Sequence, residues 1–121
     1  MEHSKLVIYS YSRCSTCRRA LAWLQDNKID YELKDIIETP PDKEMLADAI
    51  QQLGDKKYVF NTSGLSYRAL GASTVKAMSQ TEAINALAAD GKLIKRPFVV
   101  SSAGKVIVGF KHEVFTEIFL N

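Results

Sequence analysis

The sequence predicts an α/β fold in which a four-stranded mixed sheet is built from a βαβ unit and a ββα unit. A C-x-x-C motif, Cys14–Cys17, lies between a strand-like run and a helix-like run. Near the end of the chain, two β-rich runs flank a short glycine-bearing turn and precede another helix-like run. The stretch between these parts, about residues 40–91, carries mainly helix signals. We therefore expect one domain over residues 1–121, with a helical insertion at about 40–91.

The first unit begins with a short apolar, β-rich run, Leu6–Tyr9, which predicts a buried strand. The next segment predicts a helix that ends near Asn27, with Trp23 off its apolar stripe as a packing residue. The stripe has the spacing i, i+3, i+4 and i+7: Cys17, Ala20, Leu21 and Leu24. Tyr31–Ile36 alternates and predicts a second strand. Because a helix fits between the two strands, we expect them to pair in parallel.

The middle segment predicts at least two helices. Thr39–Asp42 should start the first, with Thr39 as the capping residue, and Gly54 should end it. The following residues are expected to form a β-like piece at Tyr58–Phe60, a turn, and a single helical turn near Tyr67–Leu70. A capping-box pattern, Ser79–Glu82, introduces a further helix that should end at Gly91. Its expected buried face contains Ile84, Leu87 and Ala88.

The last unit predicts an antiparallel hairpin followed by a helix. Phe98–Ser101 and Val106–Val108 are the expected strands, and Pro97 stands where the first of them begins, a place that a sheet tolerates proline. Aromatic and aliphatic residues at helical spacing form the core face of the closing helix: Phe115, Ile118 and Phe119. The βαβ and ββα units together are the two halves of a thioredoxin fold.

The C-x-x-C motif indicates thiol redox chemistry. A thiol at a helix N-terminus has its thiolate favoured by the helix dipole and by free backbone N–H groups. Cys14 should therefore attack, and Cys17, one turn later, should resolve a mixed disulfide formed at Cys14. Basic side chains add positive charge at the same place: Arg13, Arg18 and Arg19.

Other roles for the two cysteines are less well supported. A structural zinc site needs two further ligands, and the chain has no third cysteine, while His3 and His112 lie near opposite termini. A structural disulfide across so short a loop would constrain the unfolded chain little. Two inert buried cysteines remain an alternative, although Cys14 follows Arg13 directly and is a poor candidate for burial.

Composition excludes several function classes. The 16 basic and 14 acidic side chains give a net charge of +2, which is too balanced to favour direct nucleic-acid binding. No apolar run approaches transmembrane length, and the first residues lack the pattern of a signal peptide. We therefore expect a cytoplasmic protein with no membrane partner. A monomer is expected separately, and these features leave the oligomeric state open.

Several segments together resemble the arsenate-reductase-like and Spx proteins, over nearly the whole chain. The matching stretches are the cysteine loop with Arg18 after it, Ile37–Pro41, Lys95–Val100 and Val108–Phe110. The resemblance implies a thioredoxin-like fold with a helical insertion, and a proline at position 97 held in cis beside the thiol. Cys14 matches the reactive thiol of both groups, and Arg96 matches an arginine that both place before the proline.

The two groups differ at other positions. Position 17 is typically serine in the reductases and cysteine in Spx-like proteins, and this chain has Cys17. The reductases hold their oxyanion with two further arginines, where this chain has Phe60 and Gly109. Losing both would remove much of the charge-assisted binding that such a substrate needs, so the sequence argues against efficient arsenate reduction. Arg68 could be a substitute cation or merely a solvated residue.

Two functions follow. The first is a thiol-dependent oxidoreductase in which Arg18 and Arg96 stabilise the thiolate or hold an anionic substrate such as a glutathione carboxylate. In it, Pro97 and Thr16 are structural residues, and no metal or bound organic cofactor is needed because glutathione, glutaredoxin or thioredoxin would supply the electrons. The second is a Spx-like regulator that docks on RNA polymerase, with the cysteine pair as its switch.

The sequence favours the redox protein, acting on a thiol or disulfide of a small molecule or a protein. Spx-like proteins carry a basic stretch where this chain has Thr62–Leu65, which counts against the regulator. The substrate and the direction of electron flow stay open, because potentials of such pairs span about −270 to −120 mV.

Overall fold

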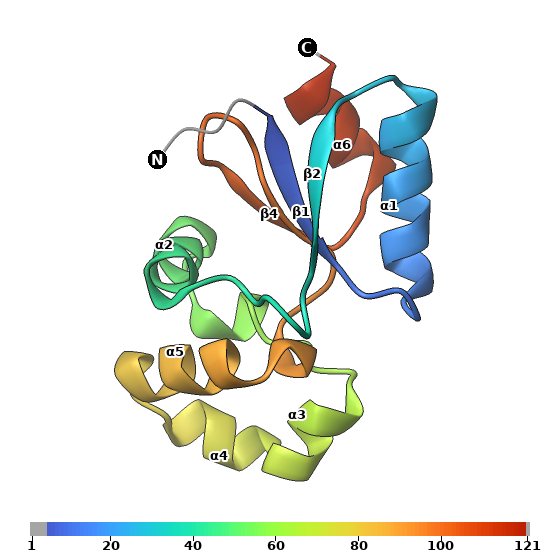
Figure 1. The fold of residues 1–121 in the computed structure, drawn as a ribbon. Coiled ribbons are helices and arrows are strands. Elements are labelled where there is room, and N and C mark those ends of the chain that lie inside the picture. Colours follow the sequence, from blue (N-terminus) through green and yellow to red (C-terminus); the bar gives the residue numbers. More distant parts are fainter. Residues whose placement is uncertain (1–4, 121) are drawn as a thin grey trace. The chain divides into compact units, whose positions relative to one another are not determined.

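A computed structural model describes residues 5–120, and the chain divides into two compact units (Figure 1). The first unit contains the chain up to Lys34 and from Arg96 onward, and the second runs from Asp35 to Lys95. Within the described part of the chain, no helix is long and apolar enough to cross a membrane.

The first unit is built on a four-stranded sheet with the strand order β2-β1-β3-β4. Its strands are β1 (Leu6–Ser10), β2 (Tyr31–Asp35), β3 (Phe98–Val100) and β4 (Val106–Val108). β3 pairs antiparallel with both β1 and β4, while β1 and β2 are joined through α1 (Ser15–Asp26). The closing helix is α6 (His112–Phe119). This mixed sheet with its helices confirms the predicted thioredoxin-like α/β fold.

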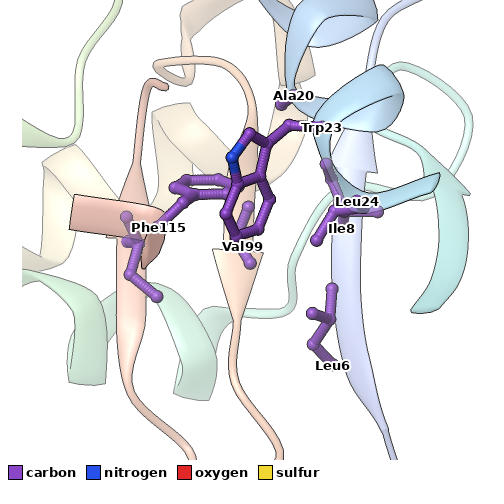
Figure 2. Close-up of a cluster of buried hydrophobic side chains, with 8 residues drawn as sticks. Leu6, Ile8, Ala20, Trp23, Leu24, Val99 and Phe115 are labelled. Atoms are coloured by element: carbon purple, nitrogen blue, oxygen red, sulfur yellow. The ribbon is translucent and has the colours of Figure 1, made fainter. Parts of the chain in front are cut away.

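One face of this sheet carries the core that joins it to α1 and α6. The cluster takes alternate residues from the strands and the inner faces of the two helices: Leu6, Ile8, Ala20, Trp23, Leu24, Val99, Ile107 and Phe115. Figure 2 shows the Trp23 indole beside the Phe115 ring, and the two rings meet edge to face at 5.5 Å between centroids. Trp23 is therefore a packing residue, as predicted, whereas Leu21 is only partly buried at the edge of the cluster.

The second unit is helical. Its elements are α2 (Lys43–Leu53), the 3-10 helix η1 (Lys56–Tyr58), α3 (Leu65–Leu70), α4 (Ala72–Ala77), α5 (Gln80–Ala89) and the 3-10 helix η2 (Gly91–Leu93). The predicted capping box at Ser79 and Glu82 is present, and both of its hydrogen bonds form. Gly54 ends α2 in the left-handed conformation, with φ 95°, as predicted.

Three expectations for this unit need correction, and one helix had not been expected. The cap of the first helix is Asp42 and not Thr39, because the two prolines between them keep the chain extended and the Asp42 carboxylate accepts the N–H of Met45. The expected β-like piece shrinks to a single bridge between Phe60 and Ile94, and the residues before it form η1. The buried residues of α5 are Leu87, as predicted, and Ala83, while Ile84 and Ala88 are only partly buried. Helix α4 was not foreseen.

Gly91 has a different role from the helix stop that the sequence suggests. Helix α5 ends at Ala89 with Asp90 as its cap, and Gly91 opens η2. A Cβ atom at Gly91 would lie 1.9 Å from the carbonyl oxygen of Ile36. Glycine is required here because two backbone segments approach each other too closely for any side chain.

Candidate redox site

The register of the sheet explains why distant parts of the sequence meet at the cysteine loop. β1 and β3 pair with Tyr9 opposite Phe98. Tyr11 follows Tyr9 by two residues and Arg96 precedes Phe98 by two, so both lie just beyond the same end of the β1–β3 ladder. The loop that leaves β1 and the segment that enters β3 therefore lie at the same end of the sheet. The cysteine motif comes next in the chain after this loop.

Cys14 is the N-cap of α1. Its backbone is extended, and its sulfur accepts the backbone N–H of Cys17 at 3.3 Å. Its own N–H donates to the carbonyl of Tyr11 at 3.0 Å, which closes the loop before the helix. The sulfur thus takes the place of the usual capping oxygen, and a first-turn N–H points at it.

Arg96 is the cation that acts on Cys14. Partial burial acts to raise the pKa of the Cys14 thiol, but hydrogen bonds from the side chain and backbone of Cys17, together with the charge and a hydrogen bond of Arg96, outweigh it and lower this pKa. The Arg96 guanidinium lies over the Tyr11 ring, 5.0 Å from its centroid. The Arg96–Pro97 bond is cis, as the resemblance implied.

Cys17 has the opposite environment. It is fully buried, with 0% of its surface exposed, on the apolar face of α1. Burial raises its pKa to about 11, assisted by the neighbouring Cys14 and opposed by hydrogen bonds from the backbone of Tyr11 and the hydroxyl of Ser10. Both cysteines are free thiols in this structure. The pair therefore combines a half-exposed, acidic thiol with a buried, weakly acidic one.

The other predicted site residues have local partners. Arg18 is exposed, and its Nη1 donates to the carbonyl of Ser12 at 2.8 Å, an interaction that fixes the cysteine loop. Thr16 accepts a hydrogen bond from Nη2 of Arg19 at 3.3 Å. Pro97 is buried at the start of β3. The roles assigned to Arg18, Thr16 and Pro97 at the site stay predictions.

Two residues of this site were missed by the sequence analysis. Ser10 is one of two buried polar residues among those described, and its hydroxyl faces the sulfur of Cys17. Tyr11 contacts both cysteines through its backbone and Arg96 through its ring. The detectable signal was a hydroxyl residue that directly follows an apolar strand and directly precedes the cysteine loop.

The positions where the resemblance would put two arginines have structural roles. Phe60 is 1% exposed, packs beside the ring of Tyr67 and bridges to Ile94 in the core of the second unit. Gly109 has φ 76°, and its N–H donates to the carbonyl of Pro97 at 2.9 Å. Neither position offers a cation to an oxyanion.

The described residues contain no cluster of side chains suited to binding a metal ion. No group of three or more His, Cys, Asp or Glu side chains in residues 5–120 could hold an ion. His112 packs edge to face on Trp23, and His3 lies outside the described residues. The donor set at the motif is two sulfurs beside an arginine, which suits thiol chemistry.

The chain is similar to proteins of several bacteria over nearly its full length. It is 42% identical to the uncharacterized protein YusI of Bacillus subtilis over 114 residues, covering 93% of this chain and 96% of that one. It is 29% identical to an arsenate reductase of Neisseria meningitidis, covering 87% and 90%. It is 23% identical to the global transcriptional regulator Spx of Lactiplantibacillus plantarum, covering 89% and 81%.

Solved structures of similar proteins indicate the same family. A possible arsenate reductase from Streptococcus mutans superposes with a TM-score of 0.82 at 43% identity, covering 91% of this chain and 96% of that one. An ArsC-family-related protein from Bacteroides fragilis gives a TM-score of 0.85 at 40% identity, covering 93% and 96%. Residues 9–118 match the ArsC family as a whole. The chain belongs to the ArsC family.

Proposed function

We propose that this protein is a thiol–disulfide redox protein in which Cys14 attacks and Cys17 resolves. The observation that carries the proposal is the difference between the two thiols. Cys14 is partly exposed with a lowered pKa, and Cys17 is fully buried with a pKa of about 11. An attacking thiol needs access and thiolate character, whereas a resolving thiol must be shielded from outside reagents and must lose its proton only when it attacks the mixed disulfide.

The reaction proceeds in two exchanges. The Cys14 thiolate attacks one sulfur of a disulfide substrate, forms a mixed disulfide and releases the other half as a thiolate. Cys17 then loses its proton to solvent or to the leaving thiolate and attacks the Cys14 sulfur. This step releases the second half of the substrate and leaves a Cys14–Cys17 disulfide, which an external dithiol reduces.

Arsenate is a poor candidate substrate for this site. Arsenate reduction would require several cations around the oxyanion, and Arg96 is the cation that acts on Cys14. Phe60 is a core residue and Gly109 has no side chain. A disulfide asks less of the site, because the sulfur that Cys14 attacks carries no charge, as in oxidised glutathione or a protein disulfide.

Oxidised glutathione provides the direct test. Wild-type protein should form the internal disulfide and keep no glutathione, and Cys17→Ser should retain one glutathione per chain because the resolving step is blocked. Cys14→Ser should retain none, since Cys17 is buried. Intact-mass spectrometry without reductant distinguishes these products. Retention by Cys14→Ser, or no adduct on Cys17→Ser, would contradict the assigned roles.

A second candidate function is a Spx-like regulator that docks on RNA polymerase. The cysteine at position 17 favours it, because this resembles the Spx form of the motif, and relatives include the transcriptional regulator Spx.

Affinity capture from a bacterial extract with the double variant Cys14→Ser, Cys17→Ser separates the two functions. Polymerase recovered by this variant, which cannot form disulfides, supports the regulator. Partners recovered only by Cys17→Ser support the redox protein.

A further inference from the structure

We propose that Tyr11 is the positioning residue of this site, and that its ring holds the Arg96 guanidinium beside the Cys14 sulfur. The inference rests on the proposed redox function of Cys14 and extends it. Tyr11 would take no part in bond making. It would set how much of the time the cation stands where the thiolate needs it.

The geometry of the ring and the guanidinium supports this role. Tyr11 follows the last β1–β3 pair, Tyr9 and Phe98, by two residues, Arg96 precedes it by two, and both side chains are half-buried. The guanidinium carbon lies 5.0 Å from the ring centroid, within the range of a cation–π contact. Arginine stacks on aromatic faces through its flat guanidinium while its N–H groups remain available at the edge. One guanidinium can therefore rest on the ring and act on the sulfur together.

The backbone of Tyr11 fixes the ring relative to both thiols. Its carbonyl accepts the N–H of Cys14 at 3.0 Å, and its backbone also hydrogen-bonds to the sulfur of Cys17. A tyrosine elsewhere in the chain could bind the arginine without fixing the position of the guanidinium relative to the two sulfurs. Because Tyr11 is tied to Cys14 and Cys17 by its main chain, the place of its ring is set by the same loop that places the sulfurs.

The other cations near the motif leave this role to Arg96. Arg18 donates to the carbonyl of Ser12, and Arg19 donates to Thr16. Arg13 is exposed on the loop. Arg96 is the cation whose charge and hydrogen bond favour the Cys14 thiolate. An unsupported arginine side chain samples many rotamers, so losing the ring would dilute its effect on the sulfur.

The test compares Tyr11→Leu with Tyr11→Phe, because leucine removes the π face and phenylalanine keeps it, and both keep the backbone bonds. Each is made in a Cys17→Ser chain so that only Cys14 reports. The rate of alkylation by iodoacetamide is measured against pH. Tyr11→Leu should raise the Cys14 pKa and slow alkylation below that pKa about two- to fivefold. The high-pH plateau should not fall, and Tyr11→Phe should match the parent.

Two controls separate positioning from general damage. Tyr58→Leu removes a ring from a similar pair in the second unit, where Lys57 lies 5.2 Å from the ring centroid, and it should leave the Cys14 profile unchanged. In an Arg96→Gln background, Tyr11→Leu should have no further effect on the Cys14 pKa. If Tyr11→Leu merely damaged the structure, it would lower the melting temperature and the alkylation rate at high pH. Its effect on Cys14 would also remain in the Arg96→Gln background.

The outcomes against the inference are distinct. Suppose that the Cys14 pKa is low in the Cys17→Ser parent and that Tyr11→Leu leaves it unchanged or lowers it further. This result overturns the inference and leaves the proposed function standing. Equal effects of Tyr11→Leu with and without Arg96 also overturn it. An ordinary thiol pKa for Cys14 in wild-type protein would overturn the proposed function, and this inference with it.

Discussion

Cys14 and Cys17 lie three positions apart in the same motif, yet their surroundings give them opposite properties. Cys14 caps the helix, accepts an N–H and lies near Arg96, so its thiolate is favoured. Cys17 is one turn further along, on the face that packs into the core, so its charged form is penalised. The position of each sulfur on the helix decides its acidity.

The acidity difference predicts the pH dependence of alkylation. Because only the thiolate reacts, the Cys14 rate should rise with pH and level off above its lowered pKa. Cys17 should stay unreactive through neutral pH, since its pKa of about 11 keeps it protonated and it is buried. Iodoacetamide kinetics on Cys17→Ser and Cys14→Ser report each thiol alone. Faster alkylation of Cys17 at pH 7 would contradict this ordering.

The sequence supplied part of this site and not the rest. The burial of Cys17 could be predicted, because it follows from the helical spacing that Cys17 shares with Ala20 and Leu24. Tyr11 could not, because its contact with Arg96 depends on how β1 and β3 are registered, and that register joins residues 85 positions apart. Local patterns carry no such information.

Among the helices, α5 begins at a capping box and α2 ends at a glycine, and both signals can be read in the sequence, whereas α4 has no such signal. Helix α4 follows Gly71 and has no capping side chain, and its six residues include three of low helix propensity, Ser73, Thr74 and Val75. Tertiary packing of Val75, which is buried, supports it. Helices of this kind cannot be predicted from local signals.

The cap of α2 can be tested by removing a single carboxylate. Asp42→Ala should lower the free energy of unfolding by about 1 kcal/mol, because the N–H of Met45 then loses its acceptor in the first turn. Asp48→Ala is the matched control, since the half-buried Asp48 lies in the middle of the same helix and its carboxylate accepts a side-chain hydrogen bond from Gln52 rather than a first-turn backbone N–H. Urea denaturation of both variants compares them. Equal losses would mean that the cap contributes nothing of its own.

Gly91 offers a second test at this scale. Gly91→Ala should destabilise the protein by about 1–3 kcal/mol or more, because the new methyl group meets the Ile36 carbonyl at a distance that forces the backbone to move. Gly64→Ala is the control, since its Cβ would meet the flexible side-chain amide of Asn61 and its φ of −84° is ordinary. Thermal unfolding should separate the two, and a stable Gly91→Ala protein would refute the close approach.

For the molecule as a whole, family membership and chemistry need not coincide. The fold and most elements of the first unit follow from alternation, helical spacing and turn residues in the sequence, and the cis proline followed from the resemblance. The substrate does not follow, because it depends on a few side chains placed on a shared scaffold. The expected single domain over residues 1–121 stays a prediction.

Arsenate turnover tests the function at this scale. With glutathione and glutaredoxin supplied, arsenate-dependent NADPH oxidation should be negligible, because the positions of two expected arginines are held by Phe60 and Gly109. The same coupled assay with a disulfide substrate checks that the protein is active. Robust consumption of NADPH with arsenate would show that one arginine beside the thiol suffices.

The burial of Cys17 has a consequence for damage by peroxide. A peroxide molecule that oxidises Cys14 leaves a sulfenic acid, which either condenses with Cys17 and releases water or meets a second peroxide and becomes a sulfinic acid that ordinary thiols cannot repair. Cys17 is shielded from solvent, so it stays reduced for the first of these reactions. Its high pKa keeps that condensation slow. We therefore expect the motif to survive sparse oxidant through the internal disulfide and to be over-oxidised by a sudden excess of peroxide.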